Sequence, residues 1–342
     1  MRNSTFLSAC RREKTPYTPV WLMRQAGRYM EEYRKVRARF AFLDLCRRPD
    51  LACEITVTAV ERLGVDAAIL FSDILLLLEP LGRGLSYGGG DGPVFSRPVR
   101  GRADVDALRE FDPEEELSFV YEAVRQSRAA LAGKLPLIGF AGAPFTLASY
   151  LIEGRGSRPF VETKRFLHAD GEAWHALAAR LVDLVARHIN AQIEAGADAI
   201  QVFDSWVGCL APEDYRAYVL PHMRELFSRI QPGVPVIHFS TGTGGMIELI
   251  RDAGGTVIGL DWRVDLDAAW RRCGYHVAVQ GNLDPVVLLA SRAEIRRQAG
   301  EILKRAAGRP GHVFNLGHGV LQQTPVENVV ALVDSVHELS SR

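Results

Sequence analysis

The sequence predicts an α/β fold: a single (β/α)8 barrel of the TIM type over residues 1–342, with a β-hairpin inserted after the second strand. Short apolar runs alternate with longer helical patterns along almost the whole chain, which indicates a parallel sheet. Eight such units follow one another without a long break, and this favours a closed barrel over an open doubly wound sheet. Barrels of this kind also fill 342 residues as one domain, so no second domain is required.

The expected strands are eight short runs of β-branched and other apolar residues. Turn residues or polar residues follow each of them. In chain order the runs are Pro19–Met23, Asp66–Leu70, Leu135–Ala141, Ala199–Phe203, Val234–Phe239, Val257–Leu260, Val277–Gln280 and Val313–Leu316.

Helical patterns fill the stretches between these runs. The segment Asp50–Leu63 offers Asp50 as an N-cap after Pro49. The stretch 161–195 is long enough that we expect more than one helix in it.

Two later helices have sequence signals for their first residues. Ser291 and Glu294 form one capping box. Thr324 and Glu327 form another, with Pro325 at the first helical position. We therefore expect Ser291 and Thr324 to be N-caps.

A glycine-rich stretch from Gly82 to Arg100 interrupts the alternation after the second run. Two short apolar segments, Leu85–Tyr87 and Pro93–Phe95, flank the glycines at 88–92, and this predicts a hairpin beside the barrel. A phosphate-binding loop is the functional alternative. No Lys-Ser/Thr pair follows and no helix begins there, so we adopt the hairpin.

The charge balance argues against a general nucleic-acid or membrane-surface binder. Lys+Arg and Asp+Glu are both 41, so the formal net charge is zero, whereas such binders depend on a basic excess. The 47% share of hydrophobic residues is ordinary for a soluble protein with a sizeable core. We expect neither nucleic acid nor membrane as a partner.

The cysteines and the first residues predict a cytoplasmic location. The five cysteines are odd in number and scattered without a CxxC pair, which is typical of reduced thiols. The first residues lack the apolar core of a signal peptide. The longest apolar stretch, 67–81, is interrupted by Asp73 and Glu79 and is too short to span a bilayer.

The strongest functional signal is a pair of arginines at the end of an apolar run. Arg24 and Arg28 follow the first expected strand, and Asp73 interrupts the apolar residues after the second. Two guanidinium groups so close to a buried run need a negative partner, and the run contains none, so a ligand is expected to supply it. A group of cations facing a buried carboxylate is the arrangement we expect.

Polar residues follow the other expected strands as well. In a (β/α)8 barrel the active site lies at the C-terminal ends of the strands, so these residues should converge. They are Ser72 and Asp73, Pro144 and Tyr150, Asp204 and Ser205, Ser240 and Thr241, Asp261, Asn282 and Asp284, and His318 in Asn-Leu-Gly-His-Gly.

Each of these residues also has a structural interpretation. Arg24 and Arg28 could pair with helix carboxylates, and Asp73 could cap the next helix. Tyr150 could be a core aromatic with a satisfied hydroxyl, and His318 a structural histidine. The residues alone leave these alternatives open.

The sequence contains no recognisable metal or cofactor motif. His238-Phe239-Ser240 has no second ligand at short spacing, and neither HExxH nor a cysteine cluster occurs. There is also no nucleophile elbow, a GxSxG placed between a strand and a helix, and no GxGxxG fingerprint. We expect no metal and no cofactor.

Four segments closely resemble the uroporphyrinogen decarboxylase family. They are Pro-Val-Trp-Leu-Met-Arg-Gln-Ala-Gly-Arg-Tyr-Met (19–30), Phe-Ser-Asp-Ile-Leu (71–75), Gly-Phe-Ala-Gly-Ala-Pro-Phe-Thr-Leu-Ala-Ser-Tyr (139–150) and Asn-Leu-Gly-His-Gly (315–319). The resemblance implies a homodimeric, cofactor-free carboxy-lyase of haem biosynthesis on a (β/α)8 barrel. Its substrate would be uroporphyrinogen III, whose four acetate side chains lose CO2 to give coproporphyrinogen III.

The resemblance also implies site residues. Asp73, Arg24, Arg28, Tyr150 and His318 would be catalytic, with Asp73 at the centre of the macrocycle. The order of the decarboxylations, the isomer preference, the proton donor and the need for a dimer do not follow from it. The substrate would contact Arg24, Gln25, Ala26, Gly27, Arg28, Arg37, Asp73, Tyr150, Phe203, Ser205 and His318.

Two rival functions are considered. Zinc-dependent corrinoid or coenzyme M methyltransferases resemble this fold but bind zinc through a His-x-Cys pair and a later cysteine. Here His238-Phe239-Ser240 stands at that place and no cysteine follows Cys273, so a thiolate–zinc site is not expected. A non-catalytic tetrapyrrole carrier is the other rival, and it would not need the central aspartate together with every arginine.

Overall fold

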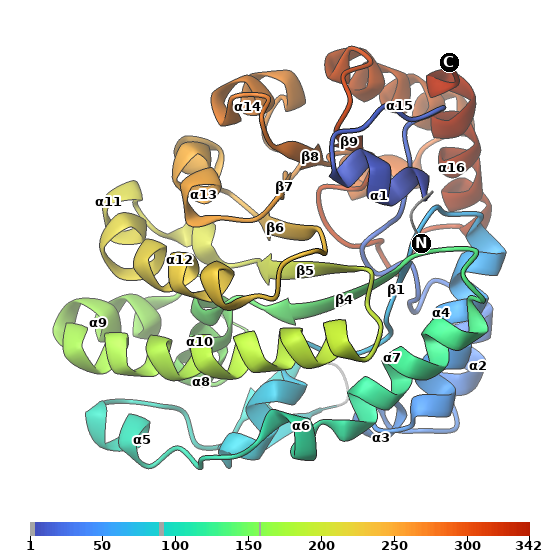
Figure 1. Ribbon diagram of the computed structural model, residues 1–342. Helices are drawn as coiled ribbons and strands as arrows, with labels where there is room; N and C mark the ends of the chain where they lie inside the picture. The colour runs from blue at the N-terminus through green and yellow to red at the C-terminus, as the bar shows by residue number, and fades with distance from the viewer. Residues whose placement is uncertain (1–3, 89–91, 157–158) are drawn as a thin grey trace.

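The computed structural model describes residues 4–88, 92–156 and 159–342 and shows a curled parallel sheet surrounded by helices (Figure 1). The sheet has the order β1-β4-β5-β6-β7-β8-β9, and all its pairs are parallel. These strands are β1 (Ala68–Ile69), β4 (Leu137–Gly142), β5 (Ala199–Asp204), β6 (Val236–Ser240), β7 (Val257–Gly259), β8 (Ala278–Gln280) and β9 (His312–Val313).

The segment around Val20 closes the sheet into a barrel. Val20 forms a parallel bridge with Phe314, next to β9, and its carbonyl accepts the Asp66 N–H at 2.8 Å, next to β1. It thus fills the eighth strand position, and the predicted TIM-type barrel is confirmed. The expected strand Pro19–Met23 is reduced to this bridge because the Met23 N–H already donates to the Asn315 side chain at 3.1 Å. The expected single domain over residues 1–342 stays a prediction.

Helices cover the outside of the sheet (Figure 1), where they bury its outer face. The helices are α1 (Thr5–Cys10), α2 (Glu31–Arg37), α3 (Phe42–Cys46), α4 (Pro49–Leu63), α5 (Arg102–Asp106), α6 (Pro113–Glu116), α7 (Ser118–Ala130), α8 (Pro144–Glu153), α9 (Val161–Ala169), α10 (Gly171–Glu194), α11 (Pro212–Asp214), α12 (Leu220–Arg229), α13 (Ile247–Ala253), α14 (Leu266–Cys273), α15 (Arg292–Ala306) and α16 (Val326–Ser340). No helix in the described part of the chain is long and apolar enough to span a membrane.

The helix caps confirm some predictions and correct others. The stretch 161–195 does contain two helices, α9 and α10. Helix α4 begins at Pro49, so Asp50 is not its N-cap; proline suits the first helical position, and Asp50 lies in the first turn. Of the two predicted caps near the C-terminus, Ser291 accepts the Glu294 N–H at 3.3 Å. Thr324 does not cap α16, because Pro325 occupies that position without a side-chain bond.

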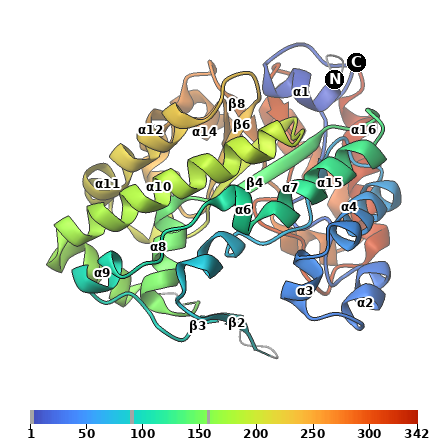
Figure 2. The same cartoon turned by 60° about the horizontal axis from the view of Figure 1, so that its bottom comes forward.

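The predicted hairpin is present as β2 (Leu85–Tyr87) paired antiparallel with β3 (Pro93–Phe95). Its glycine turn at 89–91, and with it part of the alternative phosphate loop, lies outside the described residues. The hairpin stands beside the barrel (Figure 2) and is held to the end of α8, where the Phe95 N–H donates to the Gly154 carbonyl at 2.7 Å. Its position brings β2 to the edge of the barrel mouth.

Polar side chains link the strands inside the barrel. Trp21 Nε1 donates to Gln280 Oε1 at 2.9 Å, and Gln280 Nε2 donates to Gln201 Oε1 at 3.0 Å. All three side chains are buried, so each bond satisfies groups that would otherwise be costly to desolvate. Towards the C-terminal ends of the strands, the interior opens into a cavity.

Candidate active site

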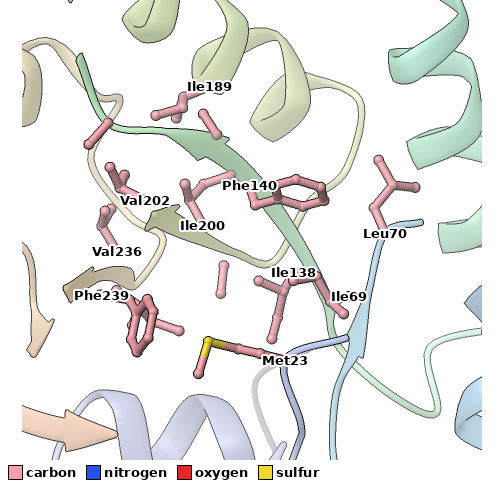
Figure 3. Close-up of a cluster of buried hydrophobic side chains, with 14 of the residues drawn as sticks. Met23, Ile69, Leu70, Ile138, Phe140, Ile189, Ile200, Val202, Val236 and Phe239 are labelled. Atoms are coloured by element: carbon pink, nitrogen blue, oxygen red, sulfur yellow. The ribbon is translucent and has the colours of Figure 1, made fainter. Parts of the chain in front are cut away.

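A cavity of about 800 Å³ lies at the C-terminal ends of the strands. This volume is in the range of small-molecule sites. Its apolar wall includes Met23, Ile69, Phe140 and Phe239, and Figure 3 shows these side chains, which come from the segment after Val20 and from β1, β4 and β6. The polar and charged groups in the lining are Arg24, Arg28, Arg37, Ser72, Asp73, Tyr29, Tyr33, Tyr87, Ser205, His318 and Gln322.

Arg24 and Arg28 face this cavity without a carboxylate partner among the described residues. The structural ion-pair interpretation of these arginines is therefore not supported. Arg34 of α2 fixes the backbone just after Arg28. Its guanidinium donates to the carbonyls of Arg28 at 3.0 Å and Tyr29 at 2.7 Å. Arg37 also lines the cavity, but one of its N–H groups donates to the Phe40 carbonyl at 2.6 Å.

Among the described residues, Asp73 is the one carboxylate in the lining of the cavity. Its Oδ1 accepts the Leu75 N–H at 2.7 Å in a local turn. Asp73 does not cap the next helix, Leu76–Leu81, because Leu75 is the N-cap residue and no side chain bonds there. Burial raises the pKa of Asp73, while the Leu75 N–H, the Tyr87 hydroxyl and the charge of Arg24 act in the opposite direction. Asp73 thus combines a local structural bond with a place in the cavity wall.

His318 lines the cavity and follows the last strand, β9. Its Nδ1 accepts the Gly319 N–H at 2.8 Å, which assigns the proton of the neutral ring to Nε2. Burial lowers the pKa of His318 to about 4, and the charges of Arg24 and Arg263 add to this effect. At neutral pH His318 is therefore an uncharged N–H donor.

Two of the expected site residues, Gln25 and Tyr150, are not in the lining of the cavity. Gln25 is fully buried; its Oε1 accepts the Leu22 N–H at 3.1 Å and its Nε2 donates to the Ala67 carbonyl at 3.1 Å. Tyr150 packs against Trp206 with ring centroids 3.8 Å apart and is not part of the lining. Burial raises the pKa of Tyr150 to about 12, and the charge of Asp73 is the next cause.

The remaining expected residues do line the cavity. Ala26 and Gly27 belong to the loop between the two arginines, and Ser205 follows β5. Phe203 also lines it, with its ring edge-on to Phe140 at 5.6 Å between centroids. Of the side chains that the sequence predicted at the strand ends, six line the cavity: Arg24, Arg28, Ser72, Asp73, Ser205 and His318. The others are not in its lining: Pro144, Tyr150, Asp204, Ser240, Thr241, Asp261, Asn282 and Asp284.

Some cavity residues were missed by the sequence analysis. Tyr33 and Phe42 come from α2 and α3, and Tyr87 comes from β2. These three follow no barrel strand, so the strand-end pattern does not include them. The sequence offered one signal for them: Tyr87 is an aromatic residue at the end of the predicted hairpin strand Leu85–Tyr87.

No group of three or more potential metal ligands occurs among the residues that the structure describes. The cavity lining contains no cysteine in the described part of the chain. His238 is fully buried on β6 beside Asp204, with Nε2 3.9 Å from Oδ2, and is not part of the lining. The expected absence of a metal and of a cofactor stays a prediction.

Comparison with known proteins gives a consistent result over the whole chain. Residues 1–339 match the family model "Uroporphyrinogen decarboxylase (URO-D)". The chain is 57% identical over 340 residues to a uroporphyrinogen decarboxylase of Carboxydothermus hydrogenoformans, covering 99% of this chain and 97% of the relative. It is 55% identical over 335 residues to the one from Sorangium cellulosum, covering 98% and 96%.

Among solved structures, a methyltransferase from Methanosarcina mazei superposes with a TM-score of 0.83 over 98% of this chain and 97% of that chain. The identity is 21%, so this likeness shows the fold alone.

Proposed function

The chain belongs to the uroporphyrinogen decarboxylase family, a family of carboxy-lyases in porphyrin and haem biosynthesis, and we propose that its cavity removes CO2 from the four acetate side chains of uroporphyrinogen III to give coproporphyrinogen III. The observation that carries the proposal is a single cavity in which, among the described residues, two arginines without a carboxylate partner and one half-buried carboxylate, Asp73, come together. The substrate needs both, because it has a rim of carboxylates around four inward-pointing pyrrole N–H groups.

Arg24 and Arg28 bind substrate carboxylates. A guanidinium offers parallel N–H donors that match a carboxylate, and the apolar wall of the cavity strengthens such pairs by excluding water. Arg37 adds a third cation to the lining of the cavity. His318, neutral at pH 7, donates its Nε2–H to the same rim.

Asp73 binds the centre of the macrocycle. Its cavity-facing oxygen accepts pyrrole N–H groups, while Leu75 holds the other oxygen. Protonation of one pyrrole at its α-carbon gives an iminium-like ring, which accepts the electron pair of the breaking C–C bond as CO2 leaves. Asp73 stabilises the positive charge of that ring, a preorganised electrostatic role, and the substrate itself serves as the electron sink.

After CO2 leaves, the exocyclic methylene takes up a proton to become a methyl group, and the ring carbon loses its extra proton. Arginine, with a pKa above about 12, is a poor acid for either step. Tyr150, with its pKa raised to about 12, is also a weak acid in the resting site. The donor that starts each cycle is therefore not assigned.

An anaerobic assay tests the proposal. Purified protein is given enzymatically generated uroporphyrinogen III with a chelator, and the products are separated by carboxylate number. Stepwise appearance of seven-, six-, five- and four-carboxylate products is expected. Tight binding without loss of CO2 would favour a carrier, a requirement for added zinc would favour the methyltransferase-like rival, and no binding would contradict the assignment.

Two further properties belong to the proposal: a homodimer and a cytoplasmic location. Both are supported by the resemblance to the family, and the scattered reduced thiols suit the second. Sedimentation of the purified protein and fractionation of cells test them. The proposed single domain can be tested by limited proteolysis.

A further inference from the structure

The short segment 261–263, just after β7, packs against the segment that carries His318. Gly317 lies so close to it that a Cβ there would collide with the backbone nitrogen of Trp262. The indole of Trp262 meets the imidazole of His318 with ring centroids 6.4 Å apart and ring planes at 78°. This is an edge-to-face aromatic pair, which favours one relative orientation of the two rings. Trp262 itself is not in the lining of the cavity.

The indole of Trp262 also contacts the guanidinium of Arg263. The guanidinium carbon lies 4.0 Å from the centroid of the indole, which is a cation–π contact. Asp261 holds that guanidinium in place, because Nη1 of Arg263 donates to its Oδ2 at 2.6 Å. The Arg263 N–H donates to Oδ1 of the same carboxylate at 3.1 Å. The indole therefore lies against a guanidinium that is itself fixed by an ion pair.

Asp261 anchors this segment to the neighbouring strands. Its side chain is buried, and its Oδ2 accepts the Gly242 N–H at 2.8 Å from the loop after β6. Its carbonyl accepts Nδ2 of Asn282, which follows β8, at 2.8 Å. Asp261 and Asn282 are two of the predicted strand-end residues that do not line the cavity. Their bonds fix the backbone from which Trp262 reaches His318.

The orientation of the His318 ring needs such a support. The ring has one hydrogen bond to its own segment, in which Nδ1 accepts the Gly319 N–H at 2.8 Å. This bond sets the tautomer but leaves the ring able to tilt about it. A neutral N–H donor depends on alignment, because a hydrogen bond weakens steeply when its angle falls below about 120°. The tilt of the ring therefore decides how well Nε2–H can bind a ligand.

We propose that Trp262 is a positioning residue for His318: its indole, held by the Asp261–Arg263 ion pair, fixes the tilt of the imidazole that lines the cavity. The catalytic meaning of this contact rests on the proposed function, in which Nε2–H of His318 donates to a substrate carboxylate. The packing of the two rings does not depend on that function. It also explains why Asp261 is buried at a strand end without lining the cavity.

The test compares Trp262→Leu with Tyr275→Leu. Tyr275 is a matched control because its ring also carries a guanidinium, that of Arg309 at 4.7 Å, and it is not in the lining of the cavity. Carbon-13 relaxation of labelled histidine rings is measured in the substrate-free protein, with His318 assigned from His318→Asn. Its order parameter should fall from about 0.85 to below about 0.6 in Trp262→Leu and stay high in Tyr275→Leu. The buried ring of His188 is the internal reference and should stay rigid throughout.

Steady-state kinetics give the second readout. KM should rise about tenfold in Trp262→Leu while kcat changes less, because a bond from His318 to a substrate carboxylate is present both before and in the transition state. Trp262→Phe keeps an aromatic ring and should recover part of the loss. Tyr275→Leu should leave both constants unchanged. A loss of folded protein alone would lower the apparent kcat without raising KM.

Arg263→Gln keeps both rings and removes the group that holds the indole, so it carries the same test where Trp262→Leu does not fold. Arg309→Gln is its control. A His318 ring that stays rigid in the folded variant overturns the inference, whatever happens to turnover. A mobile ring in a protein without decarboxylase activity supports the positioning contact and contradicts only the proposed function.

Discussion

Arg24 reaches the cavity through an unusual backbone conformation. Its φ is 61°, in the left-handed region that residues other than glycine rarely adopt and that costs on the order of 1–3 kcal/mol. The conformation turns the chain sharply after the apolar residues 20–23. The side chain then passes so close to Gly319 that a Cβ there would collide with its Cγ and Cδ atoms. The glycine after His318 thus leaves room for the arginine.

Gly319→Ala should therefore reduce activity by displacing the Arg24 guanidinium. A misplacement of about 1 Å can cost about a hundredfold in rate, and we expect a loss of roughly ten- to hundredfold in kcat/KM with KM raised. The unfolding temperature should change little, because the methyl meets a side chain and not the backbone. Gly245→Ala is the control, since a Cβ at Gly245 meets nothing within 4 Å. A fully active Gly319→Ala enzyme would contradict this role of the glycine.

Asp73→Asn tests the electrostatic role of the central carboxylate. The amide keeps the shape and can still accept N–H groups through its oxygen, but it cannot stabilise a cationic ring. Turnover should be mostly lost while substrate binding stays within about tenfold, equivalent to ~1.4 kcal/mol. Single-turnover kinetics measure the loss of turnover, and a separate binding titration measures the change in substrate affinity. A loss of turnover explained only by lost binding would count against the role.

At the scale of elements, the two predicted N-caps near the C-terminus, Ser291 and Thr324, can be compared directly, because one caps its helix and the other does not. Ser291 accepts the Glu294 N–H, whereas the buried hydroxyl of Thr324 has no partner among the described residues. Ser291→Ala should lower the free energy of unfolding by about 1 kcal/mol. Thr324→Val should be neutral or slightly stabilising, because it removes an unpaired buried hydroxyl. Urea unfolding measures both, and an equal loss in the two variants would refute the assignment of the caps.

Closure of the barrel depends on Asp66. Its carboxylate accepts the Val20 N–H at 2.7 Å and the Tyr17 hydroxyl at 2.8 Å, and it pairs with His337 of α16 at 2.7 Å. It therefore ties the N-terminal segment that fills the eighth strand position to the last helix. These partners lie 46, 49 and 271 residues away along the chain.

Asp66→Ala should accordingly destabilise the whole molecule. The Val20 N–H would be left buried without an acceptor, and we expect a loss on the order of 3 kcal/mol in the free energy of unfolding. Asp44→Ala is the control; its side chain is 64% exposed and lies 3.7 Å from Arg47, so the loss there should stay below about 1 kcal/mol. Denaturant unfolding with equal m-values would show that the difference is in stability. Similar losses in both variants would mean that Asp66 does not hold the barrel closed.

Buried neutral histidines make the fold sensitive to acid. Burial lowers the pKa of His188 and of His312 to about 4, whereas an unfolded histidine titrates near 6.5. Between these values the unfolded chain binds more protons than the native one, so stability rises with pH and is lost as pH falls from about 6.5 to 4. Each histidine contributes a slope of about 1.4 kcal/mol per pH unit in this window.

His188→Gln should therefore flatten the pH dependence of the unfolding free energy by about one proton. The measurement is a series of urea unfolding curves between pH 4 and 7. An unchanged slope in this variant would show that His188 is not held neutral in the native state.

The fold and most of the candidate site could be predicted from the sequence because both rest on local patterns. Alternating apolar runs indicated the barrel, and in a parallel barrel the residues after the strands must meet at one end. That topology predicts that Arg24, Arg28, Asp73 and His318 lie together, and all four line the cavity. The predicted strand lengths and the predicted N-caps Asp50 and Thr324 were less accurate. The residues at which a helix or strand ends depend on hydrogen bonds with neighbouring segments.

By itself the sequence determined the fold class, the family, and the chemical types of the groups at the cavity. Only the tertiary structure decided which side chains face the cavity and which support it. Gln25 follows Arg24 directly but is turned into hydrogen bonds with the backbone, and Tyr87 enters from a hairpin that no strand-end rule includes. That Arg24 and Arg28 have no carboxylate partner among the described residues, and that Asp66 bonds to Val20 and His337, also depends on which distant segments come together. A linear sequence does not contain such distances, because they arise only when packing of the whole chain fixes each backbone and rotamer.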